Sequence, residues 1–156
     1  MLNKSILALG MSVIVLSLAD EAGSHCQIPC GIYNDHARVL EMWEHYTTID
    51  KSVRKIKALA GKADAQSANQ LARWVHNKEQ HAEKIIRIIS DYFLAQKIKP
   101  VPESDKQGYK KYLKQLRDHH SVLVAAMKCK QSADLGEVSE LARSLGPLKK
   151  YWPAKK

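Results

Sequence analysis

Apolar residues recur every three or four positions along most of the chain, which is the period of an α-helix that buries one face. Four such segments follow one another: residues 35–60, residues 64–96, a third from about residue 104, and residues 135–145. The expected core-facing positions are Val39, Met42, Tyr46, Ile49, Val53, Ile56 and Ala60, then Leu71, Val75, Ala82, Ile85, Ile89 and Tyr92, then Tyr109, Leu113, Leu116, His120, Leu123 and Met127, and finally Leu135, Val138, Leu141 and Leu145. Only Lys78 interrupts the second stripe.

Residues that start or stop helices separate these segments. Asn34 or Asp35 can cap the first helix, and Gly61 follows it as a C-terminal cap. The breaks further along are Pro100 and Pro102, the sequence "QSADLG" at 131–136, and Gly146 with Pro147. No stretch alternates with the period of a β-strand for more than a few residues. The sequence therefore predicts an all-α protein, an up-and-down four-helix bundle over residues 35–156.

Residues 1–24 are expected to be a cleavable leader. Lys4 precedes an almost uncharged run from Ser5 to Ala19, and small residues follow it. The run is shorter than the ~20 residues of a membrane-spanning helix and fits the apolar part of a signal sequence. Its removal by a processing protease leaves one domain over residues 25–156 without a stable membrane span. The leader suggests export, to a periplasm or the outside; a cytoplasmic pro-segment or a membrane anchor is the alternative.

The chain is strongly basic, with a net charge of +9. Loss of the leader removes one lysine and two acidic residues, which makes the charge +10. The lysines are scattered at helical spacing without a nucleic-acid-binding motif, so solvated helix faces are the simpler interpretation and no nucleic-acid partner is expected. A positive field also suits the arrival of a small anion.

Between leader and bundle lies a short hook, residues 25–34, which contains two of the three cysteines, Cys26 and Cys30. Ordering each residue costs about 1–2 kcal/mol, and ten residues cannot form a core, so a disulfide or a metal has to hold the hook. The third cysteine, Cys129, lies in an apolar helical stretch and is expected to be a buried, inert thiol, or a partly exposed one because lysines flank it.

Cleavage after Ser24 would make His25 the first residue and give the hook a new donor set. The α-amine, the Cys26 amide and the Cys26 thiolate would close two adjacent chelate rings in one plane, and the Cys30 thiolate could complete the square. The His25 imidazole could then bind axially. Planar nitrogen and sulfur donors suit nickel or copper, whereas structural zinc prefers a tetrahedron. From these residues alone, a small disulfide and a metal site remain about equally plausible.

The hook sequence H-C-x-x-P-C-G-x-Y resembles the nickel-binding hook of the nickel superoxide dismutases. It is present as His25, Cys26, Pro29, Cys30, Gly31 and Tyr33. The segments "NKEQHAEK" (77–84) and "SDYFLAQKIKP" (90–100) also resemble the second helix of that family. The resemblance covers nearly all of residues 25–156 and is weakest after about residue 105.

The resemblance implies an enzyme that converts superoxide to dioxygen and hydrogen peroxide by Ni(II)/Ni(III) cycling. One nickel ion per subunit would be held by the amine and imidazole of His25, the amide and thiolate of Cys26, and the thiolate of Cys30. Pro29 would turn the hook, followed by Gly31, and Tyr33 would line the approach to the metal. The family also implies a homohexamer in which each hook packs against a neighbouring subunit.

Two features depart from the family pattern. Some members have an acidic residue where this chain has Gln27. In some, a glutamate of the first helix and an arginine of the second hold the axial imidazole. Glu41 is the candidate glutamate, although a one-residue slip would place Leu40 there, and the arginine position falls on His81.

Two other function classes are compatible with the chain. One is a secreted helical binding protein with a disulfide-closed N-terminal loop and a basic face. The other is a protein that sequesters nickel or copper without turnover. The first predicts that Cys26 and Cys30 are already bridged, and the second predicts metal binding without consumption of superoxide.

Overall fold

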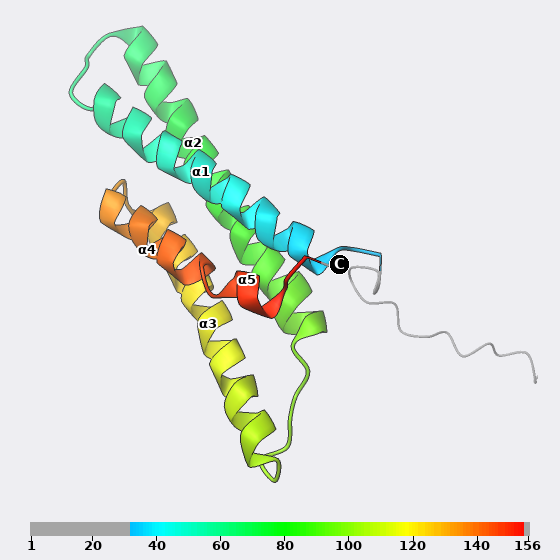
Figure 1. The fold of residues 1–156 in the computed structure, drawn as a ribbon. Coiled ribbons are helices and arrows are strands. Elements are labelled where there is room, and N and C mark those ends of the chain that lie inside the picture. Colours follow the sequence, from blue (N-terminus) through cyan, green and yellow to red (C-terminus); the bar gives the residue numbers. More distant parts are fainter. Residues whose placement is uncertain (1–31, 155–156) are drawn as a thin grey trace, which may run out of the picture.

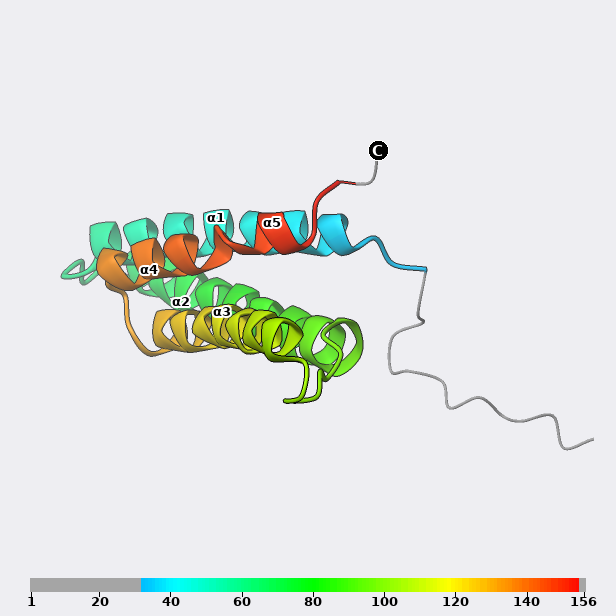
Figure 2. The same cartoon turned by 60° about the horizontal axis from the view of Figure 1, so that its bottom comes forward.

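The computed structural model describes residues 32–154, and all regular structure in this range is helical. Two long antiparallel helices, α1 (Asp35–Leu59) and α2 (Ala65–Arg87), precede η2 (Ile88–Lys97), α3 (Lys106–Gln131), α4 (Leu135–Leu145) and the single turn α5 (Leu148–Tyr151). Figures 1 and 2 show two layers, α1 with α4 and α5 in one, and α2 with α3 in the other. Each helix packs against the next and α4 packs back against α1, which confirms the predicted all-α bundle of four helices.

The helix boundaries follow the capping residues. The Asn34 side chain accepts a hydrogen bond from the Ala37 backbone at 3.1 Å, so Asn34 is the N-cap of α1. Gly61 follows the helix with a φ of +83°, a left-handed conformation that glycine adopts without strain. The side chains of Asp64, Asp105 and Asp134 likewise accept hydrogen bonds from backbone N–H groups and cap α2, α3 and α4.

The second predicted helix continues into wider turns at its end. Over η2 the backbone is π-helical, and the N–H of Ile98 bonds to the carbonyl of Phe93 at 2.9 Å. Such turns are rare and often lie at functional sites. They bury Tyr92, Phe93 and Gln96 on the side that faces the bundle.

Most of the predicted core positions in α1, α2 and α4 are buried. The largest fully buried apolar side chains are Phe93, Met42, Ile49, Ile85, Ile89, Leu141, Leu145 and Leu148. In these three helices two predicted core positions are wrong, since Val75 is 39% exposed and Ala60 is also at the surface.

The predicted core face of α3 is wrong at three of its six positions, while Leu123 packs against the core as predicted. Leu113 and Met127 are 47% and 41% exposed, and His120 is exposed as well. The buried positions of α3 are instead Asp118, His119, Val122, Ala125, Ala126 and Cys129. The sequence pattern predicted the larger apolar side chains to be buried. The helix instead buries small residues such as Ala125 and Ala126, which allow close packing. Because α4 is much shorter than α3, the face with Leu113 has little to pack against in residues 32–154.

Lys78, which interrupts the predicted stripe of α2, is a buried cap for α3. It is 3% exposed, and its ammonium group donates to the carbonyls of Cys129 at 2.5 Å and Lys130 at 2.6 Å. Glu79 lies 2.9 Å from the same nitrogen and balances its charge. A cation at the C-terminus of a helix is favourable because the last carbonyls there lack intrahelical partners.

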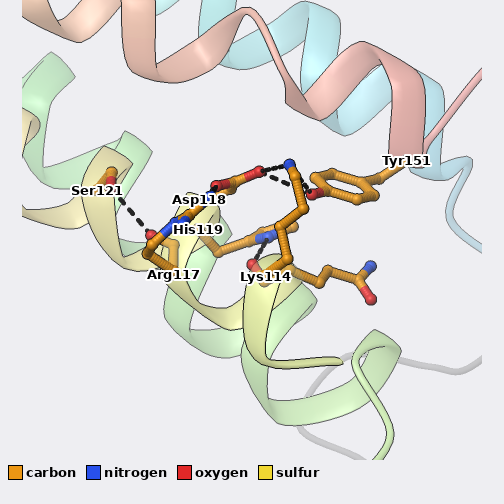
Figure 3. A network of polar contacts seen from close by, with 7 residues as sticks. Lys114, Arg117, Asp118, His119, Ser121 and Tyr151 are labelled. Atoms are coloured by element: carbon orange, nitrogen blue, oxygen red, sulfur yellow. Dashed lines mark hydrogen bonds and ion pairs between the residues drawn. The ribbon is translucent and has the colours of Figure 1, made fainter. Parts of the chain in front are cut away.

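The C-terminal segment is fastened to the bundle by the polar network of Figure 3. The hydroxyl of Tyr151 donates to Asp118 at 2.7 Å, and Lys114 reaches the same carboxylate at 2.6 Å. Buried His119 accepts a hydrogen bond from the indole of Trp152 at 3.1 Å. The carbonyl of Trp152 lies 2.9 Å from Nδ1 of His36, so this network ends at the first turn of α1.

The corrected face of α3 can be tested with two neighbouring substitutions. We expect Ala126→Leu to lower the free energy of unfolding by about 1–3 kcal/mol, because residue 126 has no room for a larger side chain. Met127→Leu should change it by less than about 0.5 kcal/mol, because that side chain is exposed. Urea unfolding at fixed protein concentration measures both, and the reverse order would restore the face expected from the sequence.

Candidate functional site

Three of the residues implicated by the sequence, Tyr33, Glu41 and His81, lie within the described part of the chain. The predicted ligands His25, Cys26 and Cys30, together with Pro29 and Gly31, lie outside the described residues. Among residues 32–154, no group of three or more histidine, cysteine, aspartate or glutamate side chains could hold a metal ion. None of the helices in this range is long and apolar enough to cross a bilayer.

Tyr33 directly precedes the N-cap of α1 and is held against η2. Its ring is 41% exposed and lies edge-on to that of Tyr92, with 6.1 Å between the centroids. The Arg38 guanidinium lies 5.1 Å from the centroid of the Tyr33 ring, within the range of a cation–π contact. Tyr33 is therefore fixed on two sides while part of its ring still faces solvent.

The hydroxyl of Tyr92 joins η2 to the start of α1. It donates to the carboxylate of Asp35 and lies 3.2 Å from the carbonyl oxygen of Tyr33, so one hydrogen is shared between two acceptors. Lys97, also on η2, lies 3.0 Å from the Asp35 carboxylate. The π-helical turns thus place a hydroxyl and an ammonium group where the hook meets the bundle.

Glu41 lies on the same face of α1 as Arg38 and His45, at the spacing that makes helical neighbours. Its Oε2 is 2.8 Å from Arg38, and its Oε1 is 3.8 Å from Nε2 of His45. Leu40, the alternative position, is 44% exposed. The Arg38 contact is ionic but poorly aligned, because Oε2 of Glu41 and Nε of Arg38 are both buried without a hydrogen bond among the described residues.

His45 is the contact between the two helices at this point. Its Nδ1 lies 3.1 Å from Nδ1 of His81 on α2, and the two rings are nearly perpendicular. Its Nε2 is buried and has no hydrogen bond within the described chain. Glu41 and His81 therefore both lie against His45.

Burial makes both imidazoles weak bases. Desolvation lowers the pKa of His45 to about 4, and the positive charges of His81 and Lys84 act in the same direction. The pKa of His81 is also lowered, by burial first and by Lys84 second. The pair is therefore uncharged at neutral pH, and Arg38 is left as the close cation of Glu41.

The sequence pattern gave no reason to assign a role to His45. The only local signal was its spacing of four residues from Glu41. Its contact with His81 joins residues that are far apart in the sequence, so it depends on how α1 and α2 pack. Cys129, in contrast, fits the first expectation, because it is 1% exposed and burial raises the pKa of its thiol to about 11.

Comparison with protein-family models identifies a family for the chain. The model for nickel-containing superoxide dismutase matches residues 20–156, which is most of the chain. The chain belongs to this family. No curated protein and no solved structure gave a significant match. Family membership makes the protein an oxidoreductase and implies nickel as its metal and superoxide as its substrate.

The lowered pKa of His45 predicts a loss of stability in acid. Below the ordinary value of 6.5 the unfolded chain binds a proton that the folded chain excludes until about pH 4. The penalty is absent above pH 6.5, grows as the pH falls, and reaches at most about 3 kcal/mol. We expect His45→Gln to lose less unfolding free energy than the wild type between pH 7 and pH 4.5.

The matched control for this measurement is His120→Gln, because His120 is exposed on α3. Urea unfolding at pH 7, 5.5 and 4.5 gives the slope for each protein. His120→Gln should retain the wild-type slope. A wild-type slope in His45→Gln would contradict the burial of a neutral imidazole.

Proposed function

We propose that the chain dismutates superoxide with a nickel ion held by the hook of a processed N-terminus. The observation that carries the proposal is the hook sequence, residues 25–33, inside a chain that belongs to the nickel-containing family. Two superoxide ions and two protons give one dioxygen and one hydrogen peroxide. When bound, nickel supplies the one-electron redox chemistry by alternating between Ni(II) and Ni(III).

The hook residues supply the donors. The amine and imidazole of His25, the amide and thiolate of Cys26, and the thiolate of Cys30 would hold one nickel ion per subunit. Thiolates and a deprotonated amide are the donors that suit square-planar nickel. This set requires removal of residues 1–24, because the amine exists only when His25 is the first residue. Pro29 would turn the chain between the two thiolates, and Gly31 directly follows the second.

The buried polar atoms on α1 fit an incoming imidazole. Oε2 of Glu41 and Nε2 of His45 lack hydrogen bonds among residues 32–154, on the helix that directly follows the hook. A carboxylate oxygen in this state is suited to accept the N–H of the His25 ring and so to fix the ring's orientation. Groups that orient a metal ligand in this way commonly change metal affinity or activity 10–100-fold.

Tyr33 and the groups around it would control access and protons. The Tyr33 ring is pinned by Tyr92 and Arg38 at the start of α1, which suits a screen that admits a small anion and excludes larger reductants. The Tyr92 hydroxyl and Lys97 are proton-bearing groups next to it. Both protons of the reaction have to reach the reduced dioxygen unit from such groups or from water.

Processing, compartment and assembly are part of the same proposal. A protease would remove residues 1–24, and the apolar leader favours export over a cytoplasmic pro-segment. The mature domain would be residues 25–156, and family resemblance favours a homohexamer. The exposed apolar face of α3 with Leu113 is one surface available for such contacts.

The three cysteines offer a direct test of the hook. We expect Cys26→Ser and Cys30→Ser to lose bound nickel and superoxide dismutation, because each removes a thiolate ligand. Cys129→Ser should retain both, since Cys129 is buried in α3. Metal analysis and superoxide decay measured on the same processed samples give the result. In the wild-type protein, bound nickel without turnover would favour a function in metal sequestration. A disulfide between Cys26 and Cys30 without bound metal would favour a function as a binding protein.

The net charge predicts a salt dependence. If the field of a chain with about ten excess positive charges steers superoxide to the hook, kcat/KM should fall as ionic strength rises from ~0.01 to ~0.15 M, over which the screening length shrinks from about 30 to 8 Å. Superoxide decay at constant pH checks this. A rate independent of salt would remove steering from the proposal and leave the nickel chemistry in place.

A further inference from the structure

The two facing imidazoles of His45 and His81 constrain each other's protons. Their Nδ1 atoms are 3.1 Å apart, so one nitrogen has to donate a hydrogen and the other has to accept it. Two neutral rings satisfy this only as opposite tautomers. One ring then carries its hydrogen on Nδ1 and the other carries it on Nε2.

Glu41 decides which ring is the donor. Nε2 of His45 lies 3.8 Å from Oε1 of Glu41, too far for a hydrogen bond but close enough for an electrostatic preference. An N–H dipole pointed at the carboxylate is favourable, whereas a lone pair pointed at it is repelled. His45 therefore carries its hydrogen on Nε2 and accepts at Nδ1, and His81 is the donor through Nδ1–H.

The surroundings keep this pair neutral. His45 is 8% exposed, and Lys84 on α2 opposes a further positive charge on either ring. On α1, Arg38 already balances Glu41 at 2.8 Å. Protonation of His45 would also place a second N–H group against that of His81, which would break the 3.1 Å hydrogen bond.

We propose that His81 and His45 form a directional imidazole relay that holds Glu41 in position for the hook. His81 donates to His45, and His45 directs its Nε2–H at Oε1 of Glu41. Oε2, which lies 2.8 Å from Arg38 without a hydrogen bond to it, accepts from the His25 ring. The last of these contacts rests on the proposed function. His45 is thus a positioning residue, and His81 acts through it as a neutral donor at the position where some members of the family have an arginine.

The tautomers can be observed directly in the nickel-loaded, reduced protein labelled with ¹⁵N-histidine. Long-range ¹H–¹⁵N correlation spectra at pH 7.5 distinguish the two neutral tautomers and the imidazolium. We expect one Nε2–H ring that disappears in His45→Gln and one Nδ1–H ring that disappears in His81→Phe. Two Nε2–H rings, or an imidazolium at either position, would overturn the relay.

The link to the metal needs a second readout, the electron paramagnetic resonance spectrum of the oxidised enzyme. If the His25 ring is held through the relay, His81→Phe should alter the nitrogen splitting and lower kcat about 10–100-fold at unchanged nickel content. His81→Gln retains an N–H donor and should restore most of both. His120→Phe, on the exposed face of α3, is the control and should match the wild type.

The outcomes separate the two proposals. A wild-type spectrum and rate in His81→Phe, with nickel present, would overturn the relay alone. A wild-type protein that binds no nickel would overturn the proposed function, and with it the role of the relay. His81 is only partly buried, so its variants should fold, and far-ultraviolet circular dichroism verifies this.

Discussion

The contact between α1 and the second helix with its π-helical extension is the interaction on which the rest of the structure depends. Among residues 32–154, every group assigned to the site lies on it or next to it. At one end, the Tyr92 hydroxyl and Lys97 fix the first turn of α1 through Asp35. Further along, His45 meets His81 between the same two helices. A ligand set carried on the segment before Tyr33 is useful only if that first turn does not move.

The C-terminal segment reinforces the same end of the bundle. Its polar network joins α3 to α5 and finishes at His36, one residue into α1. The start of α1 is thus held from both layers. This placement explains why the bundle keeps buried polar groups such as Asp118 and His119, whose desolvation is offset only because each has partners.

Much of this fold could be predicted from the sequence because its signals are local. Capping residues such as Asn34 and the left-handed Gly61 act within one turn of the chain, and they located the ends of α1 correctly. The face of α3 could not be predicted in the same way. Its apolar residues form two stripes, and the way α3 packs against α2 and α4 decides that small Ala126 is buried while Met127 is exposed.

The site residues also differ in whether local sequence signals could predict them. The hook is a contiguous motif, so the sequence was sufficient to nominate it, and membership of the nickel-containing family supports that assignment. Glu41 was nominated by its position after the hook. His45 was not, because its partner His81 belongs to another helix, and no pattern along one chain shows which residues two packed helices bring together.

We propose that the processed N-terminus is itself a ligand, and the native mass of the protein made by its own host is the sharpest test of this proposal. A chain that begins at His25, ends at Lys156 and carries one nickel ion is the expected result. A hexamer in the same spectrum would add the assembly. A chain that begins elsewhere, carries no metal and is lighter by two hydrogens would contradict the account and identify the hook as a disulfide loop.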